Sequence, residues 1–444
     1  MDLAFNVKDK PKFGQLIVFA FQQLLAILAA TIAVPSIIGN GMSQSAALFG
    51  AGVGTIVYLL FTKFKSPVFL GSSFAFIGSM FAAFGGAASA GAGYAGLILG
   101  AFFAGLVYVV IAIIVKIAGV SWINKLMPAV VIGPTVSIIG LSLAGNAIGD
   151  ALTYAKTDAG FVMNTKGWIG FICALVTLFT VMICSVYGKK MAKLIPFIIG
   201  IAAGYCVATI FTLIGNATGN AALQIVDWSA FQEMKWIPDF TFMQAYKSFG
   251  DITPSYIGTI AVAYIPVAFV VFAEHIADHK NLSSIIGHEL LEEPGLHRTL
   301  LGDGIGSIAG AFFGGCPNTT YGESVGCVAI TGNASVITIL ATAIICLIAS
   351  FFAPFVTFLS TIPSCVMGGV CITLYGFIAV SGLKMIQGVD LNKNRNLFVV
   401  AAILISGIGG MTLTIGKVTL TEVACALILG IVTNLVLSRK KEEA

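Results

Sequence analysis

Two stretches of sequence, PVFLGSSFAFIGSM (residues 67–80) and PNTTYGESVGCVAI (residues 317–330), are apolar segments that are interrupted near their start. Each opens with a proline and with β-favouring or small polar residues, and then turns through GSS or YGE into a short apolar run. Such residues disfavour a continuous helix. We therefore predict a short extended strand followed by a half-helix in each segment.

The chain as a whole is far more apolar than a soluble domain. Of its 444 residues, 58% are hydrophobic and 9% are charged, and the mean hydropathy is +1.00. Runs of apolar residues long enough to cross a bilayer recur about fourteen times, if short broken ones are included. We predict an all-α polytopic membrane protein. Because unpaired backbone groups cannot face lipid, the two interrupted segments must lie within the protein and line a cavity near the midplane.

The sequence contains two matched pairs of segments in the same order along the chain. LFGAGVGTI (48–56) aligns with LLGDGIGSI (300–308), and Pro67 and Pro317 follow at similar distances. MPAVVIG (127–133) aligns with IPSCVMG (362–368). These matches predict two repeats of about seven spans, with the interrupted segments as the third and tenth. An odd number of spans forces the second repeat to enter the membrane upside down.

The positions of the basic residues predict the orientation of the chain. If the N-terminus lies inside, most of the 23 lysines and arginines fall on or near the cytoplasmic side, as is usual for membrane proteins. Both termini are therefore expected in the cytoplasm. Residues 215–254 are mixed polar and aromatic and are interpreted as the main external loop.

Ionisable residues inside the spans are the first candidates for a functional site, because they are costly in a membrane. Glu274 and Asp278 lie in the apolar helix VAYIPVAFVVFAEHIADH (262–279), and Glu323 lies in the second interrupted segment. Glu274 and Asp278 are four residues apart and thus share one helix face. We interpret the three as a buried proton or ligand site; structural carboxyl groups are the alternative. Asp303 and Glu422 are instead expected near span ends. His275 and His279 point elsewhere on the helix and are expected to reach loops or the cytoplasm.

The chemistry of these groups predicts the kind of ligand. Half-helix N-termini offer backbone N–H groups, and ionised carboxylates offer only acceptors. A planar imide or lactam edge meets both requirements, because its carbonyls accept from the backbone N–H groups and its ring N–H groups donate to the carboxylates. Phe74 and Tyr321, at the two breaks, could cover the faces of such a ring. Burial disfavours the charged form of a carboxyl group, so Glu323, Glu274 and Asp278 are expected to couple transport to a proton. A sodium site is the rival interpretation.

Four motifs taken together resemble the nucleobase/ascorbate transporter family, and its bacterial uracil permeases in particular. They are LGSSFAF (70–76), FAEHIADH (272–279), PGLHRTLLGDG (294–304) and PNTTYGESVG (317–326), and the likeness covers nearly the whole chain. The resemblance implies fourteen segments in two intertwined inverted repeats that form a core and a gate domain. The core would comprise residues 1–118 (spans 1–4) and 255–355 (spans 8–11). The gate would comprise residues 119–254 (spans 5–7 and the external loop) and 356–444 (spans 12–14 and the cytoplasmic tail).

The same resemblance implies roles for individual residues. Glu274 is similar to the carboxylate that takes a pyrimidine ring N–H, and Glu323 to a second one in the broken helix. Phe74 and Gly322 resemble positions whose backbone amides meet the pyrimidine carbonyls. The residues that resemble those packed around the ring, and the polar pair of the first span, are Ala30, Tyr321, Tyr375, Gln22 and Gln23.

Two departures from the family pattern leave the choice of nucleobase open. Gln22 is followed by Gln23 where relatives have Gln followed by His, and Asp278 stands where some uracil permeases have His. Asp at that position is similar to the purine-transporting branches, whereas Glu323 favours uracil, because purine and xanthine carriers have Gln there. We expect a uracil–proton symporter of the cell (inner) membrane, with a xanthine or other purine permease as the alternative.

Other functions fit the sequence less well. Anion exchange, found in distant relatives of similar architecture, predicts a basic residue in the interrupted segments, and neither segment contains one. The paired carboxyl groups lack a neighbouring nucleophile or metal-ligand cluster, so no enzyme is expected. The nine cysteines occur singly in apolar segments and are interpreted as small buried hydrophobes. No metal, no cofactor besides the coupling proton and no nucleic acid are expected, and the family implies a homodimer through the gate domains.

Overall fold

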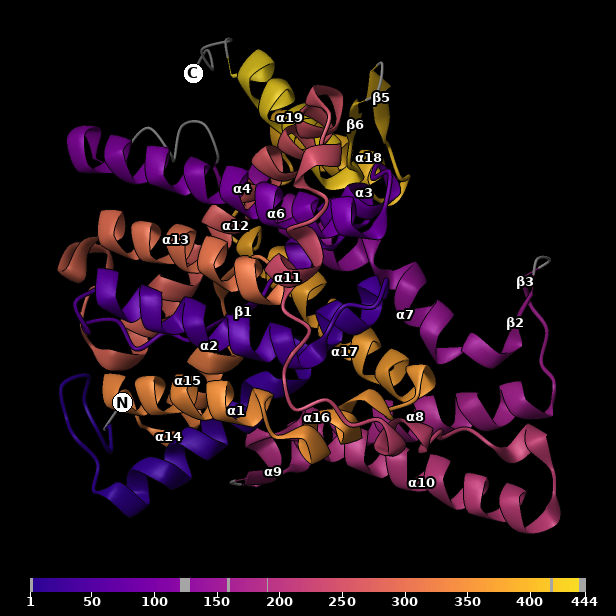
Figure 1. The fold of residues 1–444 in the computed structure, drawn as a ribbon. Helices are drawn as coiled ribbons and strands as arrows, with labels where there is room; N and C mark the ends of the chain where they lie inside the picture. Colours follow the sequence, from indigo (N-terminus) through magenta and orange to yellow (C-terminus); the bar gives the residue numbers. More distant parts are fainter. Residues whose placement is uncertain (1–2, 120–127, 158–159, 190, 416–417, 439–444) are drawn as a thin grey trace.

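The computed structural model describes residues 3–119, 128–157, 160–189, 191–415 and 418–438, and these residues are mostly helical (Figure 1). The helices are α1 (Phe13–Ile38), α2 (Gln44–Phe61), α3 (Ile77–Gly85), α4 (Ala90–Ala118), α6 (Ala129–Ser142), α7 (Ala144–Ala151), α8 (Thr165–Tyr187), α9 (Met191–Leu194), α10 (Pro196–Thr218), α11 (Thr241–Ala245), α12 (Pro254–Ile286), α13 (Leu296–Gly314), α14 (Gly322–Thr331), α15 (Val336–Ser350), α16 (Ala353–Ser360), α17 (Ser364–Met385), α18 (Asn394–Ile408) and α19 (Glu422–Leu437). The strands are β1 (Leu70–Ser72), β2 (Lys156–Thr157), β3 (Gly160–Phe161), β4 (Asn318–Thr320), β5 (Leu413–Ile415) and β6 (Val418–Leu420).

The helices confirm the prediction of a polytopic all-α membrane protein. Among the described residues, eight helices are long and apolar enough to cross a membrane, or nine if α15 and α16, bent by 82°, are taken as one span. Three shorter apolar helices add to them, at Phe74–Gly85, Asn394–Ile408 and Glu422–Leu437. The number fourteen stays a prediction, because residues such as 120–127 lie outside the described ranges.

The two interrupted segments form the strand and half-helix that the sequence predicts. β1 leads into the short turn η1 (Phe74–Phe76) and α3, and β4 leads into α14. β1 and β4 pair antiparallel, with Leu70 opposite Thr320 and Ser72 opposite Asn318. Both strands are buried along their whole length. Each strand thereby satisfies backbone groups of the other in a region without access to water.

The segments matched within the sequence also meet in space. α2 packs against α13, and α6 packs against α17, as β1 pairs with β4. Such pairwise contact between corresponding segments is what two inverted repeats related by a two-fold axis produce, so it supports the predicted repeat. Met127, the first residue of one match, lies outside the described residues.

Glycines allow α2 and α13 to approach each other closely. A Cβ atom added at Gly50 would overlap Gly310 O, and one added at Gly54 would overlap Asn318 Nδ2 and lie 2.7 Å from Gly306 O. The Asn318 side chain donates a hydrogen bond of 3.1 Å to Gly50 O. These contacts hold β4 against α2, in the manner of small-residue packing between membrane helices.

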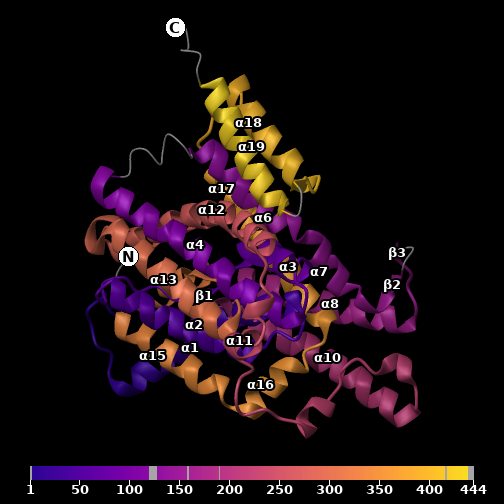
Figure 2. The ribbon, with the colours of Figure 1, turned by 45° about the horizontal axis from the view of Figure 1, so that its top comes forward.

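The other helices extend from this compact region. α8 and α10 pack as a pair that projects from the body, and α18 and α19 lie together at another end (Figures 1 and 2). α17 packs against α8 and α10, α6 packs against α18 and α19, and α6 and α17 pack against each other. In α8 and α10 only 33% of the most apolar window is buried, against 61–67% in α1, α2, α12 and α17. Much of the apolar surface of α8 and α10 is therefore available to lipid.

The contact between α2 and α13 predicts that Gly54→Ala lowers stability. The new methyl group would force the Asn318 amide and the Gly306 carbonyl to move, and overpacking of this kind costs about 1–3 kcal/mol. The measurement is thermal unfolding of the purified protein in detergent. Gly145→Ala is the matched control, because nothing lies within 4 Å of a Cβ at Gly145 in α7. Equal unfolding temperatures for the two variants would contradict the prediction.

Candidate functional site

A cavity of about 420 Å³ lies between two groups of helices, and its volume is typical of small-molecule sites. α1, α12 and α14 line one side, and α6, α8, α10 and α17, together with α9, line the other. Glu274 and Asp278 of α12 and Gly322 and Glu323 of α14 all face into it. The structure thus brings together the three carboxyl groups and one glycine that the sequence analysis selected.

The local structure explains why these groups face one space. α12 is a continuous helix of 33 residues, so Glu274 and Asp278 lie one turn apart on the same face. α14 begins at Gly322 directly after β4, and Glu323 is in its first turn. The first N–H groups of a helix have no partner within the helix, and its N-terminus favours negative charge. The start of α14 therefore offers donors to a ligand and supports a carboxylate at Glu323.

Two polar contacts hold the carboxyl groups in place. The Thr320 hydroxyl at the end of β4 donates a 2.6 Å hydrogen bond to Asp278 Oδ2. Gln23 in α1 does not line the cavity; its amide instead donates to the hydroxyl of Ser324, the neighbour of Glu323. The strand pairing thus positions Asp278 through Thr320, and α1 positions α14 through Gln23. The sequence analysis did not select Thr320, because only the strand register shows that it reaches α12.

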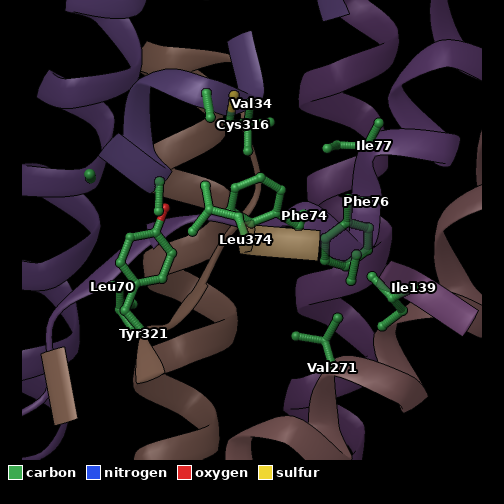
Figure 3. Packing of buried hydrophobic residues seen from close by; sticks show 14 of the residues in the cluster. Val34, Leu70, Phe74, Phe76, Ile77, Ile139, Val271, Cys316, Tyr321 and Leu374 are labelled. Carbon is green, nitrogen blue, oxygen red and sulfur yellow. The ribbon is translucent and has the colours of Figure 1, made fainter. Parts of the chain in front are cut away.

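The predicted aromatic residues are buried around this cavity. Phe74 and Tyr375 are in edge-to-face contact with ring centroids 5.7 Å apart, which joins η1 to α17. The Tyr321 ring lies against Gly71, where a Cβ atom would overlap it, and the Tyr321 hydroxyl donates to Ser72 O at 2.9 Å. Figure 3 shows Phe74 and Tyr321 within the packed apolar cluster. The lining of the cavity, as far as the described residues form it, includes neither Phe74 nor Tyr321.

A second cavity, of about 800 Å³, lies at the opposite end of α1 and α17. Ala26 of α1 lines the first cavity and Pro35 lines the second, nine residues further on, which corresponds to about 14 Å along the helix. Ala30, which is buried, lies between them. Residues between Ser229 and Asp239, from the segment predicted as the main external loop, line part of the second cavity. The two cavities are therefore separated by a buried layer.

The neighbouring face of α12 carries a buried polar network that was not among the predicted site residues. His275 and His279 are fully buried, so the expectation that they reach loops or the cytoplasm is wrong. His275 Nδ1 lies 2.7 Å from Asp303 Oδ2, and His275 Nε2 lies 2.9 Å from Thr299 Oγ1. The expectation that Asp303 lies near a span end is wrong too, because Asp303 is fully buried in α13. The signal that could have identified them is a pair of histidines at i and i+4, each directly following a carboxyl residue, so that they form a second polar face beside the first.

The hydrogen-bond partners assign the protons in this network. The Thr299 hydroxyl donates to Leu296 O, so its oxygen accepts from His275 Nε2–H. His275 and Asp303 then share one proton between Nδ1 and Oδ2, and the pair is neutral overall in either arrangement. His275 therefore connects α12 to α13 without leaving a net charge in the membrane.

The second histidine connects α12 to α2. His279 Nδ1–H donates to His275 O at 2.7 Å, which leaves Nε2 to accept from the Tyr58 hydroxyl at 2.7 Å. The Ser66 hydroxyl lies 2.7 Å from Tyr58 Oη and donates to it. Ser66 directly precedes the interrupted segment that contains β1. The network thus links the helix of the carboxyl groups to the start of the strand crossing.

Among the residues that the structure describes, one basic side chain also reaches the first cavity. Lys193 of α9 lines it together with Glu274, Asp278 and Glu323. In the sequence Lys193 served only as a marker of orientation, because its position within a basic cluster shows nothing of its distance from the carboxyl groups.

All nine cysteines are free; seven are buried as expected, whereas Cys184 is half-buried and Cys206 is exposed.

A mostly apolar cavity with a few ionisable groups among membrane-spanning helices, with a second cavity at the opposite end of the same helices, is the arrangement of a membrane transporter. The chain belongs to the permease family: the family model Xan_ur_permease, described as "Permease family", matches residues 14–416. The chain is 39% identical over 444 residues to the uracil permease of Bacillus caldolyticus, covering 99% of this chain and 96% of that protein. It is 33% identical over 436 residues to the uracil permease of Escherichia coli K12, covering 98% and 94%. These findings confirm the resemblance noted in the sequence, and the protein is a transporter and not an enzyme.

Two solved structures share the fold. The transmembrane domain of the cyanobacterial bicarbonate transporter BicA superimposes with a TM-score of 0.63 at 16% identity, covering 97% of this chain and 100% of that one. The murine anion transporter Slc26a9 superimposes with a TM-score of 0.66 at 12% identity, covering 97% and 69%. At this identity the likeness concerns the fold alone.

The histidine network predicts that Asp303→Ala lowers stability strongly. Removal of Asp303 leaves His275 Nδ1 buried without its partner, and an unsatisfied buried polar group costs about 1–3 kcal/mol. Thermal unfolding in detergent measures the effect, and Asp251→Ala, at an exposed carboxyl group, is the control. An Asp303→Ala variant as stable as the control would show that the His275–Asp303 contact contributes nothing.

Proposed function

We propose that this protein imports uracil together with a proton. The observation that carries the proposal is that Glu274 and Glu323 face one cavity of about 420 Å³ in which Gly322 begins a helix. Relatives that match nearly the whole chain are named uracil permeases. A nucleobase transporter therefore fits both the site and the family.

The donors and acceptors of the cavity complement a pyrimidine imide edge. The ring N–H groups of uracil donate to Glu274 and Glu323, which accept when ionised. The uracil carbonyls accept from the backbone N–H groups at the starts of α14 and η1, those of Gly322 and Phe74. Tyr321, Tyr375, Ala30 and Gln23 form the buried surroundings of this position.

The cluster of carboxyl groups provides the proton coupling. Glu274, Asp278 and Glu323 share one cavity. The start of α14 lies close to Asp278: a Cβ atom added at Gly322 would lie 3.9 Å from Asp278 Oδ1. Repulsion between like charges and the cost of burying charge both favour retention of a proton while the site is closed. When the site opens to water on the inner side, the proton leaves, and uracil binds more weakly and dissociates.

The positions of the two cavities support alternating access. The core domain (residues 1–118 and 255–355) carries the carboxyl groups, and the gate domain (119–254 and 356–444) provides the opposite wall. With both termini in the cytoplasm, the cavity that contains Lys193 faces inward, and the cavity lined by residues from the external loop faces outward. We further propose a multi-pass protein of the cell (inner) membrane that dimerises through the gate domains.

One observation favours a second candidate function. Asp278 lines the cavity beside Glu274, and Asp at this position is similar to what the purine-transporting branches carry. A larger purine would use the same carboxyl groups and helix N-terminus. A xanthine or other purine permease is therefore the alternative, whereas Glu323 favours uracil.

Uptake into proteoliposomes tests the substrate. We expect labelled uracil to accumulate when the interior is made alkaline, because the proton gradient then drives symport inward. Excess unlabelled xanthine or thymine should compete weakly, and replacement of sodium should leave uptake unchanged. Xanthine accumulation without uracil accumulation would replace the proposal with the purine alternative.

Glu323→Gln tests the coupling. A glutamine retains the shape of the side chain but cannot exchange a proton, so uracil accumulation should lose its dependence on the pH gradient, and net uptake should fall at least about tenfold. The same assay measures it, together with equilibrium exchange of labelled uracil. Glu292→Gln, at an exposed glutamate, is the control. Retention of gradient-driven accumulation by Glu323→Gln would assign the proton to another group.

A further inference from the structure

The N-terminal strap, defined here as residues 3–9, is bound to the loop that follows the half-helix α14. Ala4 N–H and Phe5 N–H both donate to Gly332 O, at 2.8 and 3.2 Å. Ala334 N–H donates to Phe5 O at 2.9 Å, and Phe5 and Asn333 form a parallel β-bridge. The strap is thus held to this loop by backbone pairing.

These hydrogen bonds satisfy backbone groups that the two adjoining helices leave open. Gly332 is the C-cap of α14, and its carbonyl is the acceptor for the strap. At the start of α15, Ser335 provides no side-chain cap; Val336 N–H instead donates to Val7 O at 3.1 Å, and the Ser335 hydroxyl donates to Asp9 O at 2.6 Å. The strap therefore caps the end of one helix and the beginning of the next.

Side chains fix the strap to the body of the protein. Leu3, Phe5 and Val7 are half-buried, whereas Ala4 and Asn6 between them are exposed, which is the alternation of an extended segment with one buried face. The Phe5 ring meets Phe19 of α1 edge to face, with centroids 5.8 Å apart. The strap is thereby packed against α1, a helix that lines the cavity through Ala26.

The strap bears on the site because α14 is short. α14 has ten residues, with Gly332 at one end and Gly322 and Glu323 at the other. A helix of this length moves as a rigid rod, so a shift of its C-terminal end also tilts the N–H groups and the carboxyl group that face the cavity. A displacement of about 1 Å in a binding group lowers its efficiency severely.

We infer that the N-terminal strap is a positioning element for the substrate site: it holds Gly332 and thereby sets the position of Gly322 and Glu323. The inference rests on the proposed function, since uracil is the ligand whose affinity reports the position of α14. The strap itself does not touch the cavity among the described residues.

Ala4→Pro tests this role in the full-length protein. Proline removes the N–H group that donates to Gly332 O, and we expect the Kd for uracil to rise about tenfold, since loss of this hydrogen bond and the resulting tilt weaken every contact of α14. Uracil binding to purified protein and the KM and Vmax of uptake are the measurements. KM should rise with Kd while Vmax changes less. Lys8→Ala, at an exposed side chain of the strap, should leave all three unchanged.

A covalent link separates positioning from general damage. Strands in contact lie about 4.8 Å apart, within the range of a disulfide, so Phe5→Cys with Asn333→Cys should cross-link the strap to the loop. In the Ala4→Pro background, the oxidised double-cysteine protein should bind uracil more tightly than the same protein after reduction. The reduced form is the matched control for both cysteine substitutions.

Three results would overturn the inference. If the unaltered protein binds uracil and Ala4→Pro binds it equally well, the strap does not position the site. If oxidation restores nothing, the loss of affinity comes from unfolding, which a lowered unfolding temperature would show directly. If the unaltered protein fails to bind uracil, the proposed function fails, and this inference fails with it.

Discussion

The antiparallel pairing of β1 with β4 is the constraint on which the rest of the structure depends. Two chain segments about 250 residues apart leave the helical conformation inside a membrane, where each unpaired backbone group is costly. Pairing satisfies them and allows two half-helices to begin in the interior of the protein. Glycines of α2 and the side chain of Asn318 hold this crossing in place, because a larger residue at Gly54 would meet Asn318 directly. A helix N-terminus near the centre of the molecule is available to a ligand only because the strands pair there.

α12 uses its two faces for different purposes. Glu274 and Asp278 face the cavity, where their charge or their proton can meet a ligand. His275 and His279 face α13 and α2, where every polar group that they contact is part of a network that is neutral overall. The second face thus holds the helix firmly without adding net charge to the interior. A carboxyl group that binds a ligand needs such support, since its position must hold while its charge changes.

The two cavities lie at opposite ends of the same helices, and the carboxyl groups of α12 and α14 line the first of them. A layer of buried residues that includes Ala30, Phe74 and Tyr375 lies beside the carboxyl groups, and one cavity lies on each side of this layer. The Phe74–Tyr375 contact joins an interrupted segment to α17, so a movement between the two groups of helices must alter this contact.

The sequence by itself determined the membrane class, the two interrupted segments with their strands and half-helices, and the three carboxyl groups of the cavity. Each of these follows from local chemistry: apolar length, proline and small residues, and the cost of charge in a span. The tertiary structure alone decided that His275 and Asp303 are buried partners, that Thr320 holds Asp278, that Lys193 reaches the cavity and that the N-terminal strap caps α14. Each of these contacts joins residues from different helices or strands. Their positions depend on strand register and on the rotation of packed helices, which periodicity within one segment does not specify.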